Sequence, residues 1–358
     1  MSKGKVVVGM SGGVDSSVAA YLLKKEGYEV IGVTMQIWQD EEAAIQAENG
    51  GCCGLSAIDD ARRVAEKLEI PYYVMNFKQE FKADVIDYFI AEYLEGKTPN
   101  PCIACNRYVK WESLLRRSMK IGADYIATGH YARIEKMPDR RWAIRNSVTA
   151  IKDQTYALYN LTQEQLAHTL MPVGEYTKEE IRDIAYQIDL QIAAKADSQD
   201  ICFIPDGDYA SFIEKQTKQG IPKGNFITSS GKILGEHKGI IHYTVGQRKG
   251  LGLALGYPAY VLKIITETNE VVVGTKEESM SKIVRANNIN FMAISDLKEP
   301  RRVWAKIRYN HSGDWCTVEK VGDDEIRCTF DKAQNAVTPG QAIVLYENEC
   351  VLGGGTIL

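Results

Sequence analysis

The chain has 358 residues, of which 45% are hydrophobic and 25% are charged, and its formal net charge is −4. This composition predicts a folded globular protein of more than one domain and excludes disordered and low-complexity classes. No apolar run has the length of a membrane span and no signal-peptide core follows the first residue, so we expect a cytoplasmic protein without a membrane partner. Nothing in the sequence defines an oligomer, and a monomer is the default expectation.

Short apolar strands alternate with helical segments in the first third of the chain. Strand patterns occupy residues 5–10, 28–35, 72–76 and 125–128, and helical patterns occupy 16–26, 56–68, 80–95 and 110–119. Alternation of this kind predicts an α/β fold with a doubly wound parallel sheet.

The character of the sequence changes in its second half. A helical pattern at 208–219 is followed by a glycine-rich stretch, and alternating runs then lie at 302–309, 315–321, 325–330 and 342–347. Short alternating runs separated by turn residues predict a small antiparallel β-barrel. We therefore expect a catalytic domain at 1–210, a small central domain at 211–282 and a C-terminal barrel at 283–358.

A glycine–serine loop lies between the first strand and the first helix. The sequence from Ser11 to Ser17 is SGGVDSS, in which Gly12 and Gly13 permit a tight turn and close approach of a ligand. Backbone amides at a helix start favour an anion. The loop matches neither GxxxxGK nor GxGxxG, which excludes the two commoner phosphate loops. The alternative is a turn that only caps a helix.

Grouped cysteines indicate chemistry rather than a disulfide scaffold. The chain has eight cysteines, among them the adjacent pair Cys52 and Cys53, a CxxC formed by Cys102 and Cys105, and Cys202. Such grouping in a reducing compartment suggests metal, iron–sulfur or redox chemistry. Three further cysteines lie in the strand-like C-terminal region and are expected to be small buried hydrophobes: Cys316, Cys328 and Cys350.

The segment from Asn106 to Lys152 is basic. It holds eleven Lys and Arg residues against four acidic residues, a net charge of +7, with aromatic residues interleaved. A surface for a polyanion and a pair of solvated helix faces explain this segment equally well.

The glycine–serine loop resembles the PP-loop of ATP pyrophosphatases, which cleave ATP to AMP and pyrophosphate. Five further sequence motifs match bacterial tRNA-specific 2-thiouridylases in the same order: TPNP at 98–101, TGHYA at 128–132, KDQ at 152–154, DSQDICF at 197–203 and YTVGQRKGLG at 243–252. The resemblance implies a tRNA-uridine 2-sulfurtransferase, an enzyme that adenylates C2 of the wobble uridine (position 34) and replaces its oxygen by sulfur. The products would be 2-thiouridine, AMP and pyrophosphate.

The resemblance also implies a nucleotide site. Asp15 would help organise Mg²⁺ and the leaving pyrophosphate, although an aspartate here can also cap the helix. The positions that correspond to the family's ATP site are Gly9, Met10, Ser11, Gly12, Gly13, Val14, Asp15, Ser16, Met35 and Gly129.

By position in the family motifs, Cys202 would carry a persulfide and Cys105 would be the nucleophile that forms a transient disulfide with it. This chain departs from the best-known pattern, because Cys102 stands where that pattern has an aspartate. Three thiolates that include a CxxC are a natural set of ligands for a [4Fe–4S] cluster with one open iron. A persulfide relay and a cluster on Cys102, Cys105 and Cys202 are therefore both open. Zinc on the CxxC and the adjacent pair ranks third, and one of that pair serving as a relay thiol is a weaker hypothesis.

The family resemblance further implies contacts to tRNA, with the target base held near residues 100–102. The residues implied to contact tRNA are Asn100, Pro101, Cys102, His130, Lys152, Asp153, Gln154, Arg308, Tyr309 and Gln341. Partners would be tRNAs for Lys, Glu and Gln and a cysteine desulfurase or sulfur-relay protein. Two alternatives remain: a PP-loop synthetase acting on a small molecule, and a non-enzymatic RNA-binding metalloprotein.

Overall fold

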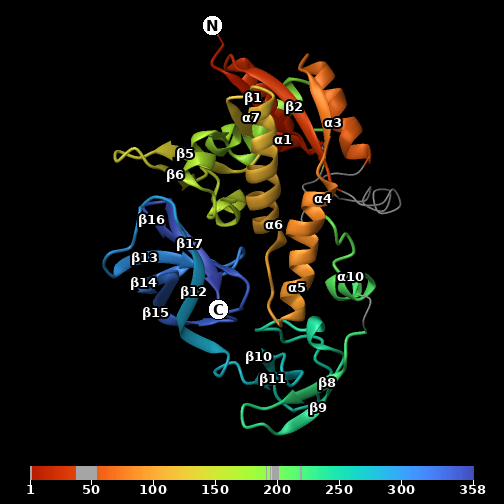
Figure 1. Cartoon of the computed structure of the whole chain (residues 1–358), viewed down its shortest axis with the longest axis vertical. Coiled ribbons are helices and arrows are strands. Elements are labelled where there is room, and N and C mark those ends of the chain that lie inside the picture. The colour runs from red at the N-terminus through yellow and green to blue at the C-terminus, as the bar shows by residue number, and fades with distance from the viewer. Residues whose placement is uncertain (1, 38–54, 191, 194, 196–200, 218–219) are drawn as a thin grey trace. The chain divides into compact units, whose positions relative to one another are not determined.

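The computed structural model describes residues 2–37, 55–190, 192–193, 195, 201–217 and 220–358 (Figure 1). The chain forms two compact units. The first comprises Met1–Ile86, Cys102–Gly207 and Asn348–Val351, and the second comprises Asp87–Pro101, Asp208–Glu347 and Leu352–Leu358. The division into three domains at residues 210 and 282 stays a prediction.

The first unit is built on a five-stranded parallel sheet with the order β3-β2-β1-β4-β7. Its strands are β1 (Lys5–Gly9), β2 (Glu29–Gln36), β3 (Tyr72–Asn76), β4 (Tyr125–Ala127) and β7 (Thr169–Leu170). The central strand β1 carries three consecutive valines that are completely buried, as expected for a parallel strand covered on both faces. The predicted α/β class with a parallel sheet is confirmed.

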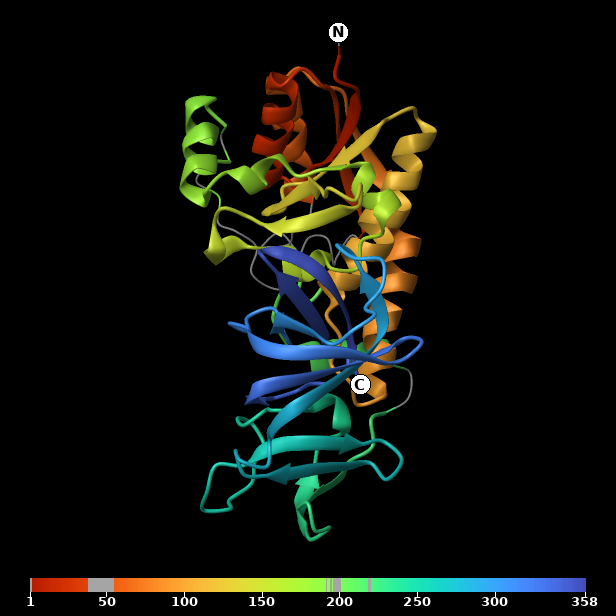
Figure 2. The same ribbon diagram turned by 90° about the vertical axis from the view of Figure 1, so that its left-hand side faces the viewer.

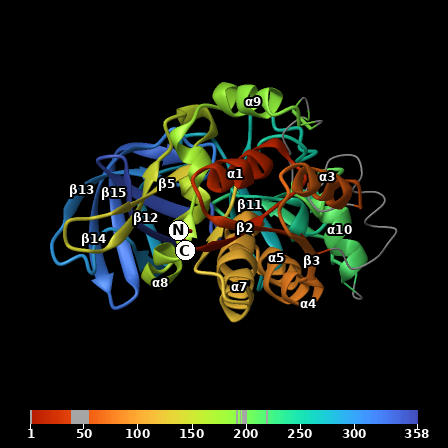
Figure 3. The same ribbon diagram turned by 90° about the horizontal axis from the view of Figure 1, so that it is seen from above.

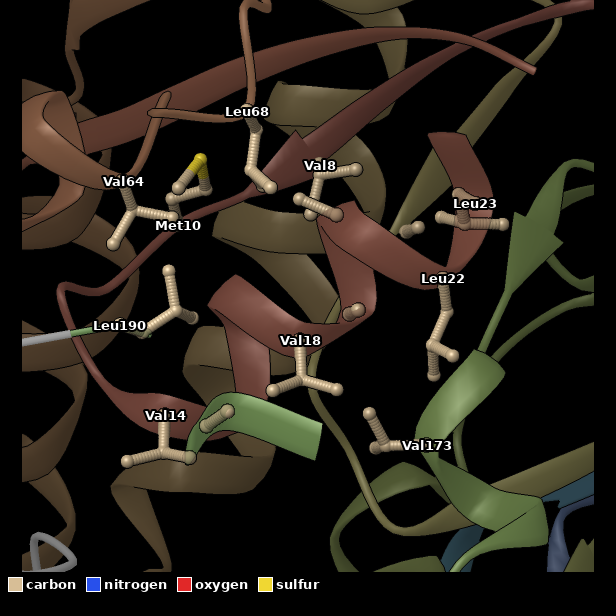
Figure 4. Close-up of a cluster of buried hydrophobic side chains, with 14 of the residues drawn as sticks. Val8, Met10, Val14, Val18, Leu22, Leu23, Val64, Leu68, Val173 and Leu190 are labelled. Atoms are coloured by element: carbon tan, nitrogen blue, oxygen red, sulfur yellow. The ribbon is translucent and has the colours of Figure 1, made fainter. Parts of the chain in front are cut away.

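Helices cover both faces of this sheet. Helices α1 (Val14–Lys25) and α3 (Leu55–Lys67) lie on one side and α7 (Leu115–Lys120) on the other (Figure 3). Helix α9 (Lys178–Gln187) packs against α1. Figure 4 shows a hydrophobic core, to which Val18 and Leu22 of α1, Val8 of β1 and Val173 belong. This core fixes the start of α1 against the end of β1.

Two predicted helices are interrupted by wide π-helical turns. The pattern at 80–95 corresponds to α4 (Lys78–Phe81), the π segment η2 (Lys82–Asp87) and α5 (Tyr88–Leu94). The pattern at 110–119 begins earlier than predicted, as α6 (Pro101–Ala104) and the π segment η3 (Cys105–Leu114) precede α7. Proline favours the first position of a helix because it has no amide hydrogen to leave unbonded, so Pro101 was an available signal for this start.

A β-hairpin lies between β4 and β7 in the chain and was not predicted. Strands β5 (Ala132–Lys136) and β6 (Trp142–Asn146) pair antiparallel, and β6 also pairs with Cys350. The hairpin lies within the basic segment, so part of that segment is a sheet rather than helix.

The second unit contains a small sheet with the order β10-β11-β8-β9 and a helix, α10 (Tyr209–Gln216). The strands are β8 (Gly224–Ile227), β9 (Ile233–His237), β10 (Tyr260–Ile265) and β11 (Glu270–Gly274). The glycine-rich stretch thus supplies strands and the turns between them.

The same unit contains the antiparallel barrel (Figure 2). Its order is β12-β15-β14-β13-β16-β17, and pairing of β12 with β17 closes it. The strands are β12 (Met280–Phe291), β13 (Arg301–Lys306), β14 (Asp314–Gly322), β15 (Glu325–Asn335), β16 (Ala342–Glu347) and β17 (Cys350–Ile357). The predicted barrel is confirmed. Cys316 and Cys328 are fully buried in its core and Cys350 is buried too, which confirms them as small hydrophobes.

Candidate functional site

The glycine–serine loop lies where β1 ends and α1 begins, at the carboxyl edge of the parallel sheet, which is where ligands bind in such folds. Gly12 has a φ of +67°, and a Cβ atom there would lie 2.3 Å from the Ala57 carbonyl oxygen of α3. Gly13 is extended and is the N-cap residue of α1. Gly12 is therefore required by the close approach of two backbones, whereas Gly13 leaves the helix start without a capping side chain.

Hydroxyl groups hold the loop in shape. The Ser11 amide donates to the Ser16 hydroxyl at 3.2 Å, and the Ser17 hydroxyl donates to the Gly13 carbonyl oxygen at 2.8 Å. The Ser11 and Ser16 hydroxyls lie 3.3 Å apart. The backbone of the loop is thus fixed by its own side chains before any ligand binds.

Asp15 is the acidic residue of the loop and is bonded by two distant residues. The Tyr131 hydroxyl donates to Oδ1 at 2.8 Å, and the Lys178 ammonium donates to Oδ1 at 2.7 Å and to Oδ2 at 2.9 Å. Sequence reasoning missed Lys178, because no motif includes this residue. The structure adds it to the loop from more than 160 residues away.

The other residues predicted to bind the nucleotide differ in which of their atoms are available to a ligand. Gly129 faces the loop, since a Cβ atom there would lie 2.6 Å from the Ser16 amide nitrogen. Met35 is half-buried on β2, next to β1. The side chains of Met10 and Val14 are buried in the core, so only their backbone atoms are available to a ligand.

His130 follows Gly129 and is held on both ring nitrogens. Nδ1 lies 2.7 Å from the Thr128 hydroxyl and Nε2 lies 3.5 Å from the Lys110 ammonium, while the Trp111 ring packs 5.5 Å away. Burial, and secondly the charge of Lys110, hold the pKa of His130 well below its usual range. The imidazole is therefore neutral at pH 7, and because an ammonium only donates, Nε2 accepts.

The KDQ segment is anchored to the first unit through its own polar side chains. The Asp153 carboxylate accepts from the Ser147 amide at 2.9 Å, and the Gln154 side-chain oxygen accepts from the Tyr131 amide at 2.9 Å. Lys152 precedes them and is half-buried. Two of the three predicted RNA contacts thus have a structural role in shaping this loop.

The cysteines of the motifs lie in the first unit. Cys102 is exposed on α6, Cys105 is half-buried at the start of η3, and Cys202 is half-buried after a stretch outside the described residues. Phe203, next to Cys202, packs edge-to-face on Phe81 with ring centroids 5.7 Å apart. Within the described ranges no three His, Cys, Asp or Glu side chains lie where they could hold a metal ion.

All three thiols of the suggested cluster belong to the described residues, so this arrangement does not form the predicted [4Fe–4S] ligand set. Cys52 and Cys53, suggested as zinc ligands or relay thiols, lie outside the described residues.

The remaining predicted residues lie in the second unit. Asn100 is half-buried and Pro101 is buried. Gln341 donates to the Thr98 carbonyl oxygen at 2.6 Å, which ties it to the TPNP motif. Arg308 donates to the Asn335 carbonyl oxygen at 3.0 Å, and Tyr309 is exposed beside it. Gln341 is thus bonded within the protein, while Tyr309 presents its ring to solvent.

Part of the basic charge of residues 106–152 is balanced by acidic residues from elsewhere. Arg117 pairs with Glu80, Arg133 lies 3.8 Å from Glu175, and Arg145 lies 3.3 Å from Glu349. The local field is therefore weaker than the count of +7 suggests. Among the described helices, none is long and apolar enough to cross a bilayer.

The first unit is an ATP-using domain of the PP-loop type. It combines a parallel sheet with a glycine–serine loop that contains no lysine and lies at the start of α1.

Comparison with known proteins agrees with this class. The chain matches family models described as tRNA methyl transferase HUP domain (residues 4–206), tRNA methyl transferase PRC-barrel domain (210–275) and aminomethyltransferase beta-barrel domain (281–357). It is 67% identical to the tRNA-specific 2-thiouridylase MnmA of Lachnoclostridium phytofermentans over 99% of both chains. It is 56% identical to the protein of that name from Acetivibrio thermocellus over the full length of both, and 54% identical to that of Clostridioides difficile over 99% of this chain and 98% of that protein. The chain belongs to the family of tRNA-specific 2-thiouridylases.

Proposed function

We propose that this protein is an ATP-dependent sulfurtransferase that converts the wobble uridine of tRNA to 2-thiouridine, with release of AMP and pyrophosphate. The observation that carries the proposal is the end-to-end similarity to 2-thiouridylases at 67% identity. The geometry of the loop supports the ATP step independently, because a prearranged backbone at a helix start suits a polyphosphate.

ATP would lie with its phosphates at the loop from Ser11 to Ser16, against Gly129. The uridine C2 oxygen would attack the α-phosphorus, and pyrophosphate would leave toward the helix start. Asp15 is the carboxylate of the loop, and Mg²⁺ beside it would neutralise charge on the leaving pyrophosphate. His130, directly after Gly129 and neutral, would contact the RNA at the same place without adding a charge.

For the sulfur step we propose a persulfide relay. The terminal sulfur of a Cys202 persulfide attacks C2 of the adenylated uridine, and AMP leaves. The Cys105 thiolate then attacks the Sγ atom of Cys202 and breaks the bond to the transferred sulfur, which stays on C2. A Cys105–Cys202 disulfide results, and a thiol reductant returns both cysteines to thiols. A cysteine desulfurase or relay protein would supply the next sulfur.

The alternative sulfur step uses a [4Fe–4S] cluster on Cys102, Cys105 and Cys202. The described arrangement of these thiols does not fit a metal site, so no step is derived through a cluster. Anaerobic purification followed by iron and sulfide analysis, on the parent and on Cys102→Ala, separates the two. A metal-free parent that thiolates tRNA supports the relay. About four irons and four sulfides per chain in the parent, and their loss in Cys102→Ala, would support the cluster mechanism instead of the relay.

The proposed substrates are the tRNAs for Lys, Glu and Gln. The proposed location is the cytoplasm, where both tRNA and ATP are present. RNA would contact Lys152 in the first unit and Arg308 and Tyr309 in the second, with the target base near Asn100 and Cys102.

The test of the overall function is the dependence of AMP formation on tRNA. With a desulfurase and cysteine present, ATP should be converted to AMP only when unmodified tRNA is added, and one 2-thiouridine should form for each AMP. AMP formation that needs an amino acid or a nucleotide instead of tRNA would support a small-molecule synthetase. Binding of tRNA without any ATP turnover would support the non-enzymatic RNA-binding protein.

A further inference from the structure

Among the ion pairs of the described residues, the one between Lys178 and Asp15 is unusual because its lysine is buried. The Lys178 side chain is 9% exposed and that of Asp15 is 28% exposed. Lys178 is also the first residue of α9, directly after the N-cap Thr177. A positive charge is disfavoured both by burial and by the positive end of a helix. Local preference therefore opposes a lysine at this position.

The carboxylate of Asp15 compensates both costs. Lys178 donates to both of its oxygens, at 2.7 and 2.9 Å. The Tyr131 hydroxyl adds a third bond at 2.8 Å, and the Lys178 ammonium lies 5.8 Å from the centre of the Tyr131 ring. Tyr131 itself is buried. These three side chains form a cluster, which we call the Asp15 clamp.

The clamp changes the charge at the loop. Asp15 is the second residue of α1, at the end of the helix that would face the phosphates of ATP. An uncompensated carboxylate there would repel a triphosphate. Common phosphate loops carry a lysine within the loop, and this loop has none. Lys178 provides a cation from a distant helix and cancels the charge of Asp15. Lys195 also donates to the loop, at the Gly12 carbonyl oxygen (3.2 Å), but its charge is paired with Asp60 at 2.8 Å.

We propose that Lys178 is a positioning residue of the ATP site, which fixes the rotamer of Asp15 and cancels its charge so that the loop accepts the phosphates. This inference rests on the proposed function, since it takes ATP as the ligand. It predicts that ATP affinity follows the summed charge of residues 15 and 178 rather than the presence of either residue alone.

The test is equilibrium binding of ATP in excess EDTA and low salt, so that Mg²⁺ does not mask the effect of the protein charges. The variants are Lys178→Met, Asp15→Asn and the double variant. We expect Lys178→Met to weaken binding about tenfold or more. Asp15→Asn leaves a net positive charge and should bind about tenfold more tightly than the parent, and the double variant should return close to the parent.

Lys67→Met is the matched control. Lys67 pairs with Asp189 at 2.6 Å in the same unit, but both side chains are largely exposed. Removing this pair should leave ATP affinity unchanged. Melting temperatures of all variants show whether the fold persists. If Lys178→Met does not fold, the double variant, which leaves no buried charge unpaired, is compared with Asp15→Asn and should bind about tenfold more weakly.

Equal ATP affinity in the parent and in Lys178→Met, or a double variant weaker than Lys178→Met, would overturn the inference. If Lys178→Met does not fold, equal ATP affinity of the double variant and Asp15→Asn would overturn the inference as well. A parent protein that binds ATP neither in EDTA nor with Mg²⁺ contradicts the proposed function and this inference together. If the parent binds ATP but the affinities of the variants do not follow the summed charge of residues 15 and 178, only the inference is contradicted.

Discussion

Gly12→Ala tests whether the contact between two backbones shapes the nucleotide loop. The new Cβ atom would lie 2.3 Å from the carbonyl oxygen and 2.8 Å from the Cα atom of Ala57, at a φ of +67°. The left-handed conformation costs alanine about 1–2 kcal/mol, and overpacking costs about 1–3 kcal/mol. Reduced entropy of the unfolded chain offsets about 0.4–1 kcal/mol. We expect a net loss of about 2–4 kcal/mol in the free energy of unfolding.

Gly13→Ala is the control within the same loop. Gly13 is extended, with φ −99° and ψ 167°, and its added Cβ atom would meet only the Ser11 hydroxyl, at 3.4 Å. Urea-induced unfolding of both variants should show destabilisation for Gly12→Ala and a change within about 0.5 kcal/mol for Gly13→Ala. ATP affinity should fall in Gly12→Ala because the loop must shift away from α3. Equal stabilities of the two variants would refute this explanation of the loop.

Three further predictions follow from the first unit. The lowered pKa of His130 means that the unfolded chain binds a proton below about pH 6.5 that the folded chain does not. Stability should therefore fall as the pH drops from 7.5 to 5.5, and His130→Asn should reduce that slope in melting curves. Trp111→Phe removes a buried bond of 2.8 Å to the Thr169 hydroxyl and should cost about 2–4 kcal/mol in urea unfolding; an unchanged midpoint would contradict this. Lys152→Met should reduce the slope of log affinity for tRNA against log salt by about 0.7–0.9 if Lys152 contacts a phosphate, and an unchanged slope would argue against that contact.

Sequence patterns predicted the parallel sheet well because its central strand β1 is buried on both faces. The valines of β1 leave no alternative to a buried strand, and the pattern at 72–76 matches β3. The hairpin formed by β5 and β6 was missed because its short strands carry arginine and glutamate in place of a clear alternation of polar and apolar residues. Its stability comes from tertiary pairing with Cys350 and Glu349, which local sequence does not encode.

For the functional site, motifs indicated which residues gather at the loop but not how their side chains are used. Gly129 faces the loop as expected, because a glycine within a motif often marks a close approach of two backbones, here those of Gly129 and Ser16. Lys178 could not be found, since a lysine at a helix start gives no signal of a partner far away in the chain. Conversely, Gln154 and Gln341 look like contact residues in sequence, yet their side chains bond the protein's own backbone. Only tertiary structure separates these roles.

The most direct test of the central claim is the fate of one labelled sulfur atom. The protein is loaded with ³⁵S persulfide by a desulfurase and separated from the donor, and unmodified tRNA and ATP are then added for a single turnover. The label should pass from Cys202 to 2-thiouridine at the wobble position only when ATP is present, and Cys202→Ser should neither hold nor transfer it. Label in the tRNA without ATP, or undiminished transfer by Cys202→Ser, would contradict an ATP-dependent persulfide relay through Cys202.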